Sequence, residues 1–381
     1  MRFLNRKDKH GIIRSFVLQY TNGKRIEKTA ILAHLEFVVH YHRKYIIYVL
    51  THSLRRRKVK RNRPSPYLPV LKQLKMLWAV SNYSCGQRLK PMIPLYLAAL
   101  KRHKELLVTA EEKAMLLKIS SATIDRLLKH DRKLINIKGR SRTKPGSLLK
   151  SQIPIKMWTD WDKTKPGFLE IDSVHHCGIS LYGAYIFTLD TTDVATGWNE
   201  CCAHLGNTQV NTIQALETIR GRLPFPLLGI DFDCGYEFVN YYLVGYCERN
   251  HITYTRARAG MKNDQNYIEQ QNYSVVRRFV GYNRLHTYDQ LKMLNKLYEL
   301  LSDYQNFFQP VMRLKKKVRD GAKVMRTYDK PKTAYQRLLE RVDVPKEIKQ
   351  RLRERYIKLN PKKLLVTITA LGKKLSEAKY R

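Results

Sequence analysis

The sequence predicts an α/β core with mixed strand pairing, preceded by an all-α region and followed by a basic, mainly helical region. From about residue 166 onward, short apolar runs alternate with segments of helical periodicity, which is typical of an α/β sheet. Earlier in the chain, apolar residues recur almost wholly at helical spacing. Charge-rich seams separate the regions, at Leu54–Pro64, Lys138–Lys156 and Arg313–Lys317. The expected organisation is a helical region at 1–137, a basic linker at 138–165, the core at 166–310 and a basic C-terminal region at 311–381.

The composition indicates a polyanionic partner inside the cell. Lys and Arg together number 72 against 32 Asp and Glu, a net charge of +40, and basic side chains that neutralise phosphates dominate nucleic-acid affinity. An RNA-binding protein would carry the same charge, so charge alone gives the class of partner and no activity. The six cysteines include no CxxC pair and suggest no disulfide framework. Apolar stretches such as Tyr45–Leu50 are too short to span a bilayer, so we expect a cytoplasmic protein without membrane contact.

Three helix pairs are expected in the N-terminal region. They are Lys28–Leu35 with Tyr41–Leu50, Val70–Val80 with Pro91–Lys101, and a pair that begins at the capping residues Thr109 and Ser120. Basic residues stand on the second helix of the first and third pairs, namely Arg43, Lys44 and Arg126. Such a helix is typical of the recognition helix of a helix-turn-helix unit. The alternative is a helical bundle with no role in DNA binding.

The core region reads as strands and helices in alternation. The expected strands are Phe168–Val174, Tyr185–Asp190, Thr196–His204, Leu227–Asp233 and Ile252–Thr255. The expected helices are Thr208–Arg220, Glu237–Arg249, Asp264–Val280 and Tyr288–Phe307.

Three carboxylates from separate elements are the candidate catalytic residues and metal ligands. Asp172 stands inside an apolar strand, where an unpaired charge is costly. Asp233 closes a second apolar strand, and Glu269 lies on a helix after the loop 260–264. If they converge at the rim of one sheet, their hard oxygen ligands suit two Mg²⁺ or Mn²⁺ ions, which serve phosphoryl displacement. Asp231 lies two residues before Asp233, on the same face of the strand, so geometry alone permits either as the second ligand.

Three segments carry a resemblance to a known family. They are Gly167–Asp172, then Asp233–Phe238, which looks like a D-N-G-x-E-F turn with Cys234 in place of Asn, and Lys262–Asn272, which looks like a K-N-D…V-E-Q-K-N segment. They resemble the catalytic core of the retroviral-integrase superfamily, and within it the bacterial insertion-sequence transposases of the ISNCY-like type. Weaker similarity extends to Ser120–Leu128 and Asn306–Pro310.

The resemblance implies an RNase H-like core and a DDE transposase. Asp172, Asp233 and Glu269 would be its triad, with two Mg²⁺ or Mn²⁺ ions. The implied reaction is cleavage at transposon ends followed by strand transfer into target DNA. The implied partners are the terminal repeats, the target DNA and further copies of the chain, in a dimer or a larger synaptic complex on the nucleoid. The His/His/Cys/Cys zinc module of retroviral integrases has no counterpart here, so helix-turn-helix units are expected in its place.

Four further basic residues are expected to contact DNA near the triad. Arg258 and Lys262 precede the helix of Glu269, and Arg277 and Arg278 lie about two turns beyond it. For the last two, a solvated helix face is an equal alternative.

Other polar residues have simpler interpretations. His175-His176-Cys177 is more plausibly structural than a metal site, because a packed triplet cannot complete a tetrahedral ligand set without distant partners. Asp190 and Asp193 are interpreted as turn formers.

Two rival functions share the predicted fold. One is a ribonuclease-H-type nuclease, which needs no long helical front end. The other is a domesticated DNA-binding regulator with an inactive core. Metal-dependent joining of oligonucleotides separates both from a transposase.

Overall fold

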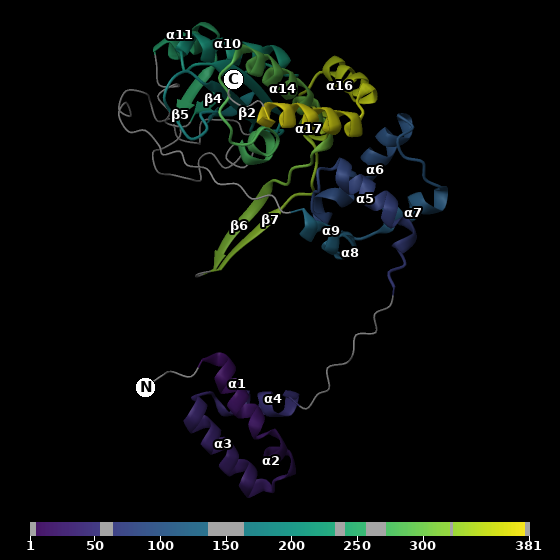
Figure 1. Cartoon of the computed structure of the whole chain (residues 1–381), viewed down its shortest axis with the longest axis vertical. Coiled ribbons are helices and arrows are strands. Elements are labelled where there is room, and N and C mark those ends of the chain that lie inside the picture. The colour runs from purple at the N-terminus through teal and green to yellow at the C-terminus, as the bar shows by residue number, and fades with distance from the viewer. Residues whose placement is uncertain are drawn as a thin grey trace. The chain divides into compact units, whose positions relative to one another are not determined.

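The computed structural model forms two compact units, at 1–65 and 66–381 (Figure 1). The structure describes residues 5–53, 64–135, 164–232, 241–256, 272–320 and 323–377. The predicted site residues Asp233, Arg258, Lys262 and Glu269 lie outside these ranges, as do most of the first seam and all of the second. None of the described helices combines the length and apolar character needed to cross a bilayer.

The first unit is a small helical bundle. Its helices are α1 (Arg6–Ser15), α2 (Val17–Asn22), α3 (Arg25–Val39) and α4 (Arg43–Ser53). Leu35, Ile46 and Leu50 are fully buried in its own core. The predicted first helix pair is therefore present as α3 and α4, both longer than expected, while α1 and α2 were not predicted. Its assignment as a helix-turn-helix unit stays a prediction.

Within the described residues, the second unit begins with five helices. They are α5 (Leu71–Val80), α6 (Gly86–Arg102), α7 (Ala110–Lys118), α8 (Ser121–Leu127) and α9 (Lys129–Leu134), after the short turn η1 (Leu68–Val70). Helix α6 begins five residues before its predicted start at Pro91, and α9 was not predicted. The Thr109 hydroxyl accepts the Glu112 N–H at 3.1 Å, and the Ser120 hydroxyl accepts the Thr123 N–H at 3.2 Å. Both predicted caps are confirmed, because each hydroxyl satisfies a backbone donor of the first helical turn.

The sheet of the second unit is mixed, as the sequence predicts. Its strands are β1 (Phe168–His175), β2 (Ile186–Asp193), β3 (Asn199–Leu205), β4 (Gly229–Phe232) and β5 (Thr253–Arg256), in the order β3-β2-β1-β4-β5. The first three strands pair antiparallel, while β4 and β5 are parallel to β1. β1 is thus the central strand, with an antiparallel neighbour on one side and a parallel neighbour on the other.

Helices cover the sheet. Helices α10 (Gln209–Arg222) and α11 (Tyr241–Arg249) pack against the sheet residues Leu169, Ile171, Ile230 and Phe232 in one apolar cluster. Helix α14 (Tyr288–Phe308) meets the opposite side of β2, where the Tyr298 hydroxyl hydrogen-bonds Thr188 at 2.7 Å. Residues of α5 and α6 share a single core with α14, so the described helices from 68 to 134 and the sheet belong to one unit.

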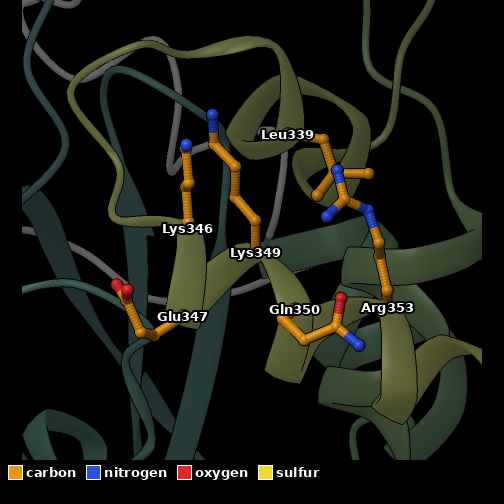
Figure 2. A pocket seen from close by; sticks show the side chains of 6 residues that line it. All are labelled: Leu339, Lys346, Glu347, Lys349, Gln350 and Arg353. Atoms are coloured by element: carbon orange, nitrogen blue, oxygen red, sulfur yellow. The ribbon is translucent and has the colours of Figure 1, made fainter.

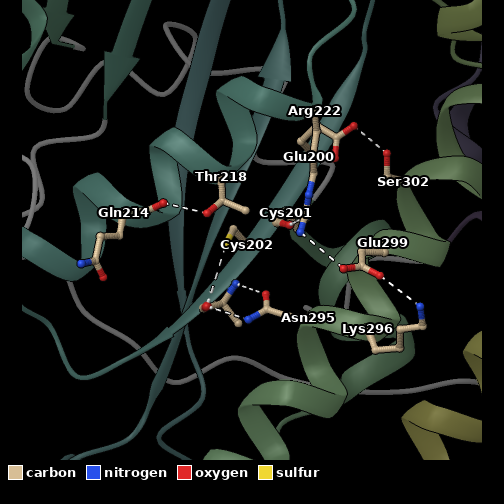
Figure 3. A network of polar contacts seen from close by, with 11 residues as sticks. Glu200, Cys201, Cys202, Gln214, Thr218, Arg222, Asn295, Lys296, Glu299 and Ser302 are labelled. Carbon is tan, nitrogen blue, oxygen red and sulfur yellow. Dashed lines mark hydrogen bonds and ion pairs between the residues drawn. The ribbon is translucent and has the colours of Figure 1, made fainter.

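Two asparagines of α14 hydrogen-bond the outer edge of strand β3, as a further strand would. Asn306 accepts the Asn199 N–H and donates to the Asn199 carbonyl, each at 2.8 Å. Asn295 likewise accepts the Ala203 N–H at 2.8 Å and donates to the Ala203 carbonyl at 3.0 Å. Between these two positions, Arg222 donates to the Cys201 carbonyl at 3.2 Å (Figure 3). The outward backbone groups of an edge strand invite pairing with another chain, and these side chains occupy them.

The C-terminal region is helical except for one hairpin. It contains β6 (Leu314–Asp320), β7 (Lys323–Tyr328), α15 (Ala334–Glu340), α16 (Lys346–Lys358) and α17 (Pro361–Glu377). The third charge-rich seam, interpreted as a linker or solvated face, is mostly the strand β6. The sequence reading missed this strand because Lys315, Lys316 and Lys317 interrupt any apolar alternation.

We predict that Asn306→Ala strongly destabilises the second unit. The change leaves the buried N–H and carbonyl of Asn199 without partners, which costs about 2–4 kcal/mol in the free energy of unfolding. Urea denaturation measures the loss. Gln305→Ala, at the neighbouring position of the same helix, is the control and should cost less than about 1 kcal/mol. Equal losses for the two variants would show that Asn306 does not protect the edge.

We also predict a pH-dependent effect of Glu200, which is buried under Trp198 and Ser302. Their side chains donate to its Oε1 at 2.9 and 2.6 Å, and burial raises its pKa from 4.5 to about 7. A raised acid pKa stabilises the fold fully below about pH 4.5, and this stabilisation is lost as pH rises through about 7. Glu200→Gln carries a neutral side chain that mimics the protonated acid. Its gain over wild type in the free energy of unfolding should therefore be about 2–3 kcal/mol larger at pH 8 than at pH 5. A difference that does not change with pH would contradict the assignment.

Candidate active site

The central strand β1 carries Asp172, the first predicted catalytic acid. Asp172 pairs in register with Asp190 of β2. Its side chain is half-buried, and its Oδ1 accepts the N–H of Ser173 at 2.7 Å. The carboxylate therefore stands on the sheet itself, in the row where β1 meets β2.

Asp190 is a second acid beside Asp172, and its interpretation as a turn former is wrong. It is fully buried within β2, where its Oδ1 accepts the Asn199 Nδ2 at 2.6 Å and the Cys201 thiol at 3.4 Å. Its Oδ2 has no hydrogen-bond partner. Burial, and to a lesser extent the charge of Asp172, raises the pKa of Asp190 to about 7 against the opposing hydrogen bonds from Asn199 and Cys201.

Asp193 does form the turn that the sequence predicts. Its Oδ2 accepts both the backbone N–H and the hydroxyl of Thr196, at 2.7 and 2.6 Å. Its Oδ1 accepts the N–H of Gly167 at 2.8 Å, which ties the start of β1 to the turn. The two acids of β2 thus differ in role, because Asp193 has a donor on each oxygen and Asp190 does not.

On its other side, β1 pairs in parallel with β4, which ends at Phe232, one residue before Asp233 in the sequence. Ile171 pairs with Phe232, and the residues that follow these two in the sequence are Asp172 and Asp233. Asp231 lies one position back, in register with Glu170 and with Thr255 of β5. Asp231 is buried and accepts the Thr255 hydroxyl at 2.8 Å, which ties it to the neighbouring strand.

Four acids share one face of the sheet. Side chains two apart on a strand, and register partners on neighbouring strands, point to the same side. Glu170, Asp172, Asp190 and Asp231 satisfy this rule. Such a face fits a divalent cation, because Asp190 keeps a buried oxygen without a hydrogen-bond partner next to the charge of Asp172. Within the described ranges no three His, Cys, Asp or Glu residues form a complete metal site; the predicted set also needs Asp233 and Glu269.

His176 is structural in this arrangement. It is fully buried, and its Nε2 hydrogen-bonds the Thr188 hydroxyl at 2.8 Å. Burial, assisted by the charges of Arg277 and His175, lowers its pKa to about 3, so the ring is neutral. This supports the structural interpretation of the His-His-Cys triplet.

Arg277 and Arg278 connect the segment that follows Glu269 to the rest of the unit. Arg277 donates to the His175 carbonyl at the end of β1 at 2.9 Å, and its guanidinium lies 4.9 Å from the ring centre of Tyr282. Arg278 donates to the carbonyl and side chain of Asn82, at 2.6 and 2.9 Å. Both belong to short helical turns, at Asn272–Arg277 (η2) and Arg278–Val280 (α13). They anchor the chain; their predicted contact with DNA stays a prediction.

The three predicted recognition residues lie on helices. Arg43 opens α4 and forms a 3.3 Å ion pair with Glu36 of α3. Lys44 is exposed, and so is Arg126 of α8, whose guanidinium donates to the Thr123 hydroxyl at 2.9 Å. Lys44 and Arg126 are accessible to a binding partner, whereas the guanidinium of Arg43 is engaged in the ion pair with Glu36.

The sequence reading missed Asp190, although a signal was present. Tyr185–Asp190 was expected to be an apolar strand, and a carboxylate in such a strand is costly without a partner. That reasoning singled out Asp172 and applies equally to Asp190.

A pocket lies apart from these acids, at the start of α16. Figure 2 shows the side chains that line it, and none of the sheet acids is among them. They are Leu339, Lys346, Glu347, Lys349, Gln350 and Arg353.

Comparisons with known proteins show a relative of similar length and two solved structures with partial similarity. No protein-family model matches the chain. Among solved structures it is similar to the catalytic core domain of BIV integrase (15% identity, 45% of this chain, 91% of that chain, TM-score 0.30). It is also similar to the HTLV-2 integrase catalytic core domain in complex with magnesium (16% identity, 38% of this chain, 90% of that chain, TM-score 0.29). The uncharacterized protein y4rM of Sinorhizobium fredii is 37% identical over 321 residues, which span 84% of this chain and 92% of that protein. The chain therefore belongs to the same family as y4rM.

Proposed function

We propose that the chain is a DDE transposase with an RNase H-like core, which cleaves transposon ends and transfers strands into target DNA. The observation that carries the proposal is the position of Asp172. It stands on the central strand, next to a parallel strand whose following residue is Asp233, and beside Asp190 with its unpartnered buried oxygen. The family-like segments around Asp233 and Glu269 and the net charge of +40 support the same reaction on DNA.

Asp172, Asp233 and Glu269 would hold two Mg²⁺ or Mn²⁺ ions, which supply Lewis-acid activation and charge neutralisation in phosphoryl transfer. Other residues of the chain position the acids on the sheet. The Ser173 N–H orients the Asp172 carboxylate, and Asn199 fixes one oxygen of Asp190 behind it. Thr255 holds Asp231 back within the sheet. This contact favours Asp233 over Asp231 as the second ligand, because Asp233 follows the strand end.

The remaining residues would bind DNA and assemble the complex. Lys44, Arg43 and Arg126 would contact the terminal repeats from helix-turn-helix units, and Arg258 and Lys262 would contact DNA near the triad. Arg277 and Arg278 would also contact DNA, in addition to forming their structural hydrogen bonds. Both transposon ends must be processed together, which implies a dimer or a larger complex, in the cytoplasm on the nucleoid.

We predict that Asp172→Asn abolishes cleavage and joining while DNA binding is retained. The amide keeps the shape of the side chain but removes a negative ligand, so joining in Mg²⁺ should fall at least about 100-fold. The assay uses labelled duplexes of the DNA that flanks the gene, and fluorescence anisotropy measures binding. Asp289→Asn is the matched control, since it removes an exposed acid of α14 and should leave joining unchanged.

Joining distinguishes the rival functions as well. Metal-dependent cleavage without joining would favour the ribonuclease-H-type nuclease, and binding without either reaction would favour the regulator. Joining by Asp172→Asn at the wild-type rate would refute the proposed triad.

We predict further that Asp233→Asn is inactive while Asp231→Asn retains joining within about tenfold of wild type. Asp231 accepts a hydrogen bond from Thr255, which an amide oxygen can also accept, so that variant keeps its local structure. Joining is measured in Mg²⁺ and in Mn²⁺, with folding verified by circular dichroism. The reverse pattern, an inactive but folded Asp231→Asn with an active Asp233→Asn, would make Asp231 the ligand.

A further inference from the structure

The hairpin formed by β6 and β7 is an exposed ribbon, here called the arm and defined as residues 314–328. Figure 1 shows the arm extending away from the five-stranded sheet. Its described side chains, at 314–316, 318, 319 and 324–328, are all exposed, including Val318, Met325 and Tyr328. A two-stranded hairpin without a covering layer is marginally stable by itself, so the arm's geometry depends on what holds its base.

The base of the arm is firmly anchored. The Arg313 N–H donates to Asp329 Oδ1 at 2.7 Å, and the Asp329 N–H donates to the Arg313 carbonyl at 2.9 Å. Arg337 closes this point with a largely buried 2.7 Å ion pair to Asp329. The Arg313 guanidinium also donates to the carbonyls of Asp193 and Ala195. The arm is thereby fixed to the turn after β2, the strand that carries Asp190.

The charge of the arm is far from balanced. Its two strands hold six basic residues against the single acid Asp320, a net charge of +5. The basic residues are Lys315, Lys316, Lys317, Arg319, Lys323 and Arg326. Six like charges on one two-stranded hairpin repel one another. Folding alone gives no reason for this pattern, whereas a bound polyanion removes the repulsion.

We propose that the arm is a DNA-binding ribbon that grips duplex DNA beside the sheet. A strand of seven residues spans about 23 Å at 3.3 Å per residue, and the major groove, about 12 Å wide, admits a two-stranded ribbon. The register places Lys316, Val318 and Met325 on one face of the arm and Arg319 and Arg326 on the other. The apolar side chains lie against sugars and base edges, and the long basic side chains of both faces reach phosphates along the groove walls. The inference rests on the proposed function, in which the sheet acids act on the same DNA.

A second copy of the chain is the competing occupant, because exposed strands with apolar side chains can pair with each other. The charge argues against it, since two arms of +5 each would repel one another. Self-pairing is therefore treated as an outcome of the test.

The test uses the full chain with Lys316→Gln, Arg319→Gln and Arg326→Gln combined. Binding to a random-sequence duplex is measured by anisotropy at several salt concentrations. Loss of three phosphate contacts should reduce the slope of log affinity against log salt by about 2–3, and lower the affinity at 0.1 M salt by about tenfold or more. The matched control, Lys292→Gln, Lys363→Gln and Lys374→Gln combined, removes three exposed charges from α14 and α17 and should leave the slope within about 0.5 of wild type.

An arm variant with the wild-type slope, or one no different from the control, overturns the proposal. So does a variant whose only change is a smaller mass in sedimentation, because that result assigns the arm to pairing between copies. Arg326→Gln alone, expected to reduce the slope by about 1, provides the answer if the triple variant does not fold. Cleavage is assayed separately. If no protein joins DNA but the arm variant loses slope, the transposase proposal fails while the arm assignment stands.

Discussion

The arrangement of the sheet depends on β1, which pairs antiparallel with β2 on one side and parallel with β4 on the other. This pairing makes Asp172 a central residue, with Asp190 beside it on β2 and the end of β4 on the other side. Carboxylates gathered on one face repel each other and lose hydration. The raised pKa of Asp190, about 7, reflects that cost. A sheet built this way is most stable when a cation or a proton compensates the acids, and the proposed reaction uses that same requirement.

Helix α14 makes the arrangement rigid. Its asparagines saturate the edge strand β3, while the Tyr304 hydroxyl donates to the Val80 carbonyl at the end of α5 at 2.7 Å. Phe308 at its C-terminus accepts the Tyr96 hydroxyl of α6 at 2.6 Å. One helix therefore connects the helices from 68 to 134 with the sheet. The segment Asn306–Pro310, which resembled only a family flank in the sequence, contributes to this connection through the Asn306 side chain and the Phe308 carbonyl.

Local rules predicted much of this structure. Capping residues such as Thr109 and Ser120, and apolar strands such as Phe168–Val174, are encoded by nearby residues and were readable. Asp172 was found because a carboxylate in an apolar strand has no local explanation. Asp190 carried the same local signal but stood at the predicted end of its strand, where an acid is typical of a turn, and only the pairing of β1 with β2 places it beside Asp172. The arm was missed because its lysines interrupt any apolar alternation, and its stability comes from anchors at Arg313 and Arg337, outside the strands. The same limit applies to Arg277, whose contact with the end of β1 depends on tertiary packing.

Iron-directed cleavage of the protein tests the central claim most directly, that Asp172, Asp233 and Glu269 form one metal site. Fe²⁺ replaces Mg²⁺, ascorbate and peroxide generate radicals at the bound ion, and the cut peptides are mapped by mass spectrometry. The account predicts cuts clustered in the segments around all three acids, suppressed by excess Mg²⁺ and lost in Asp172→Asn. Cuts at only one of the three segments, or a pattern unchanged in Asp172→Asn, would contradict a shared site.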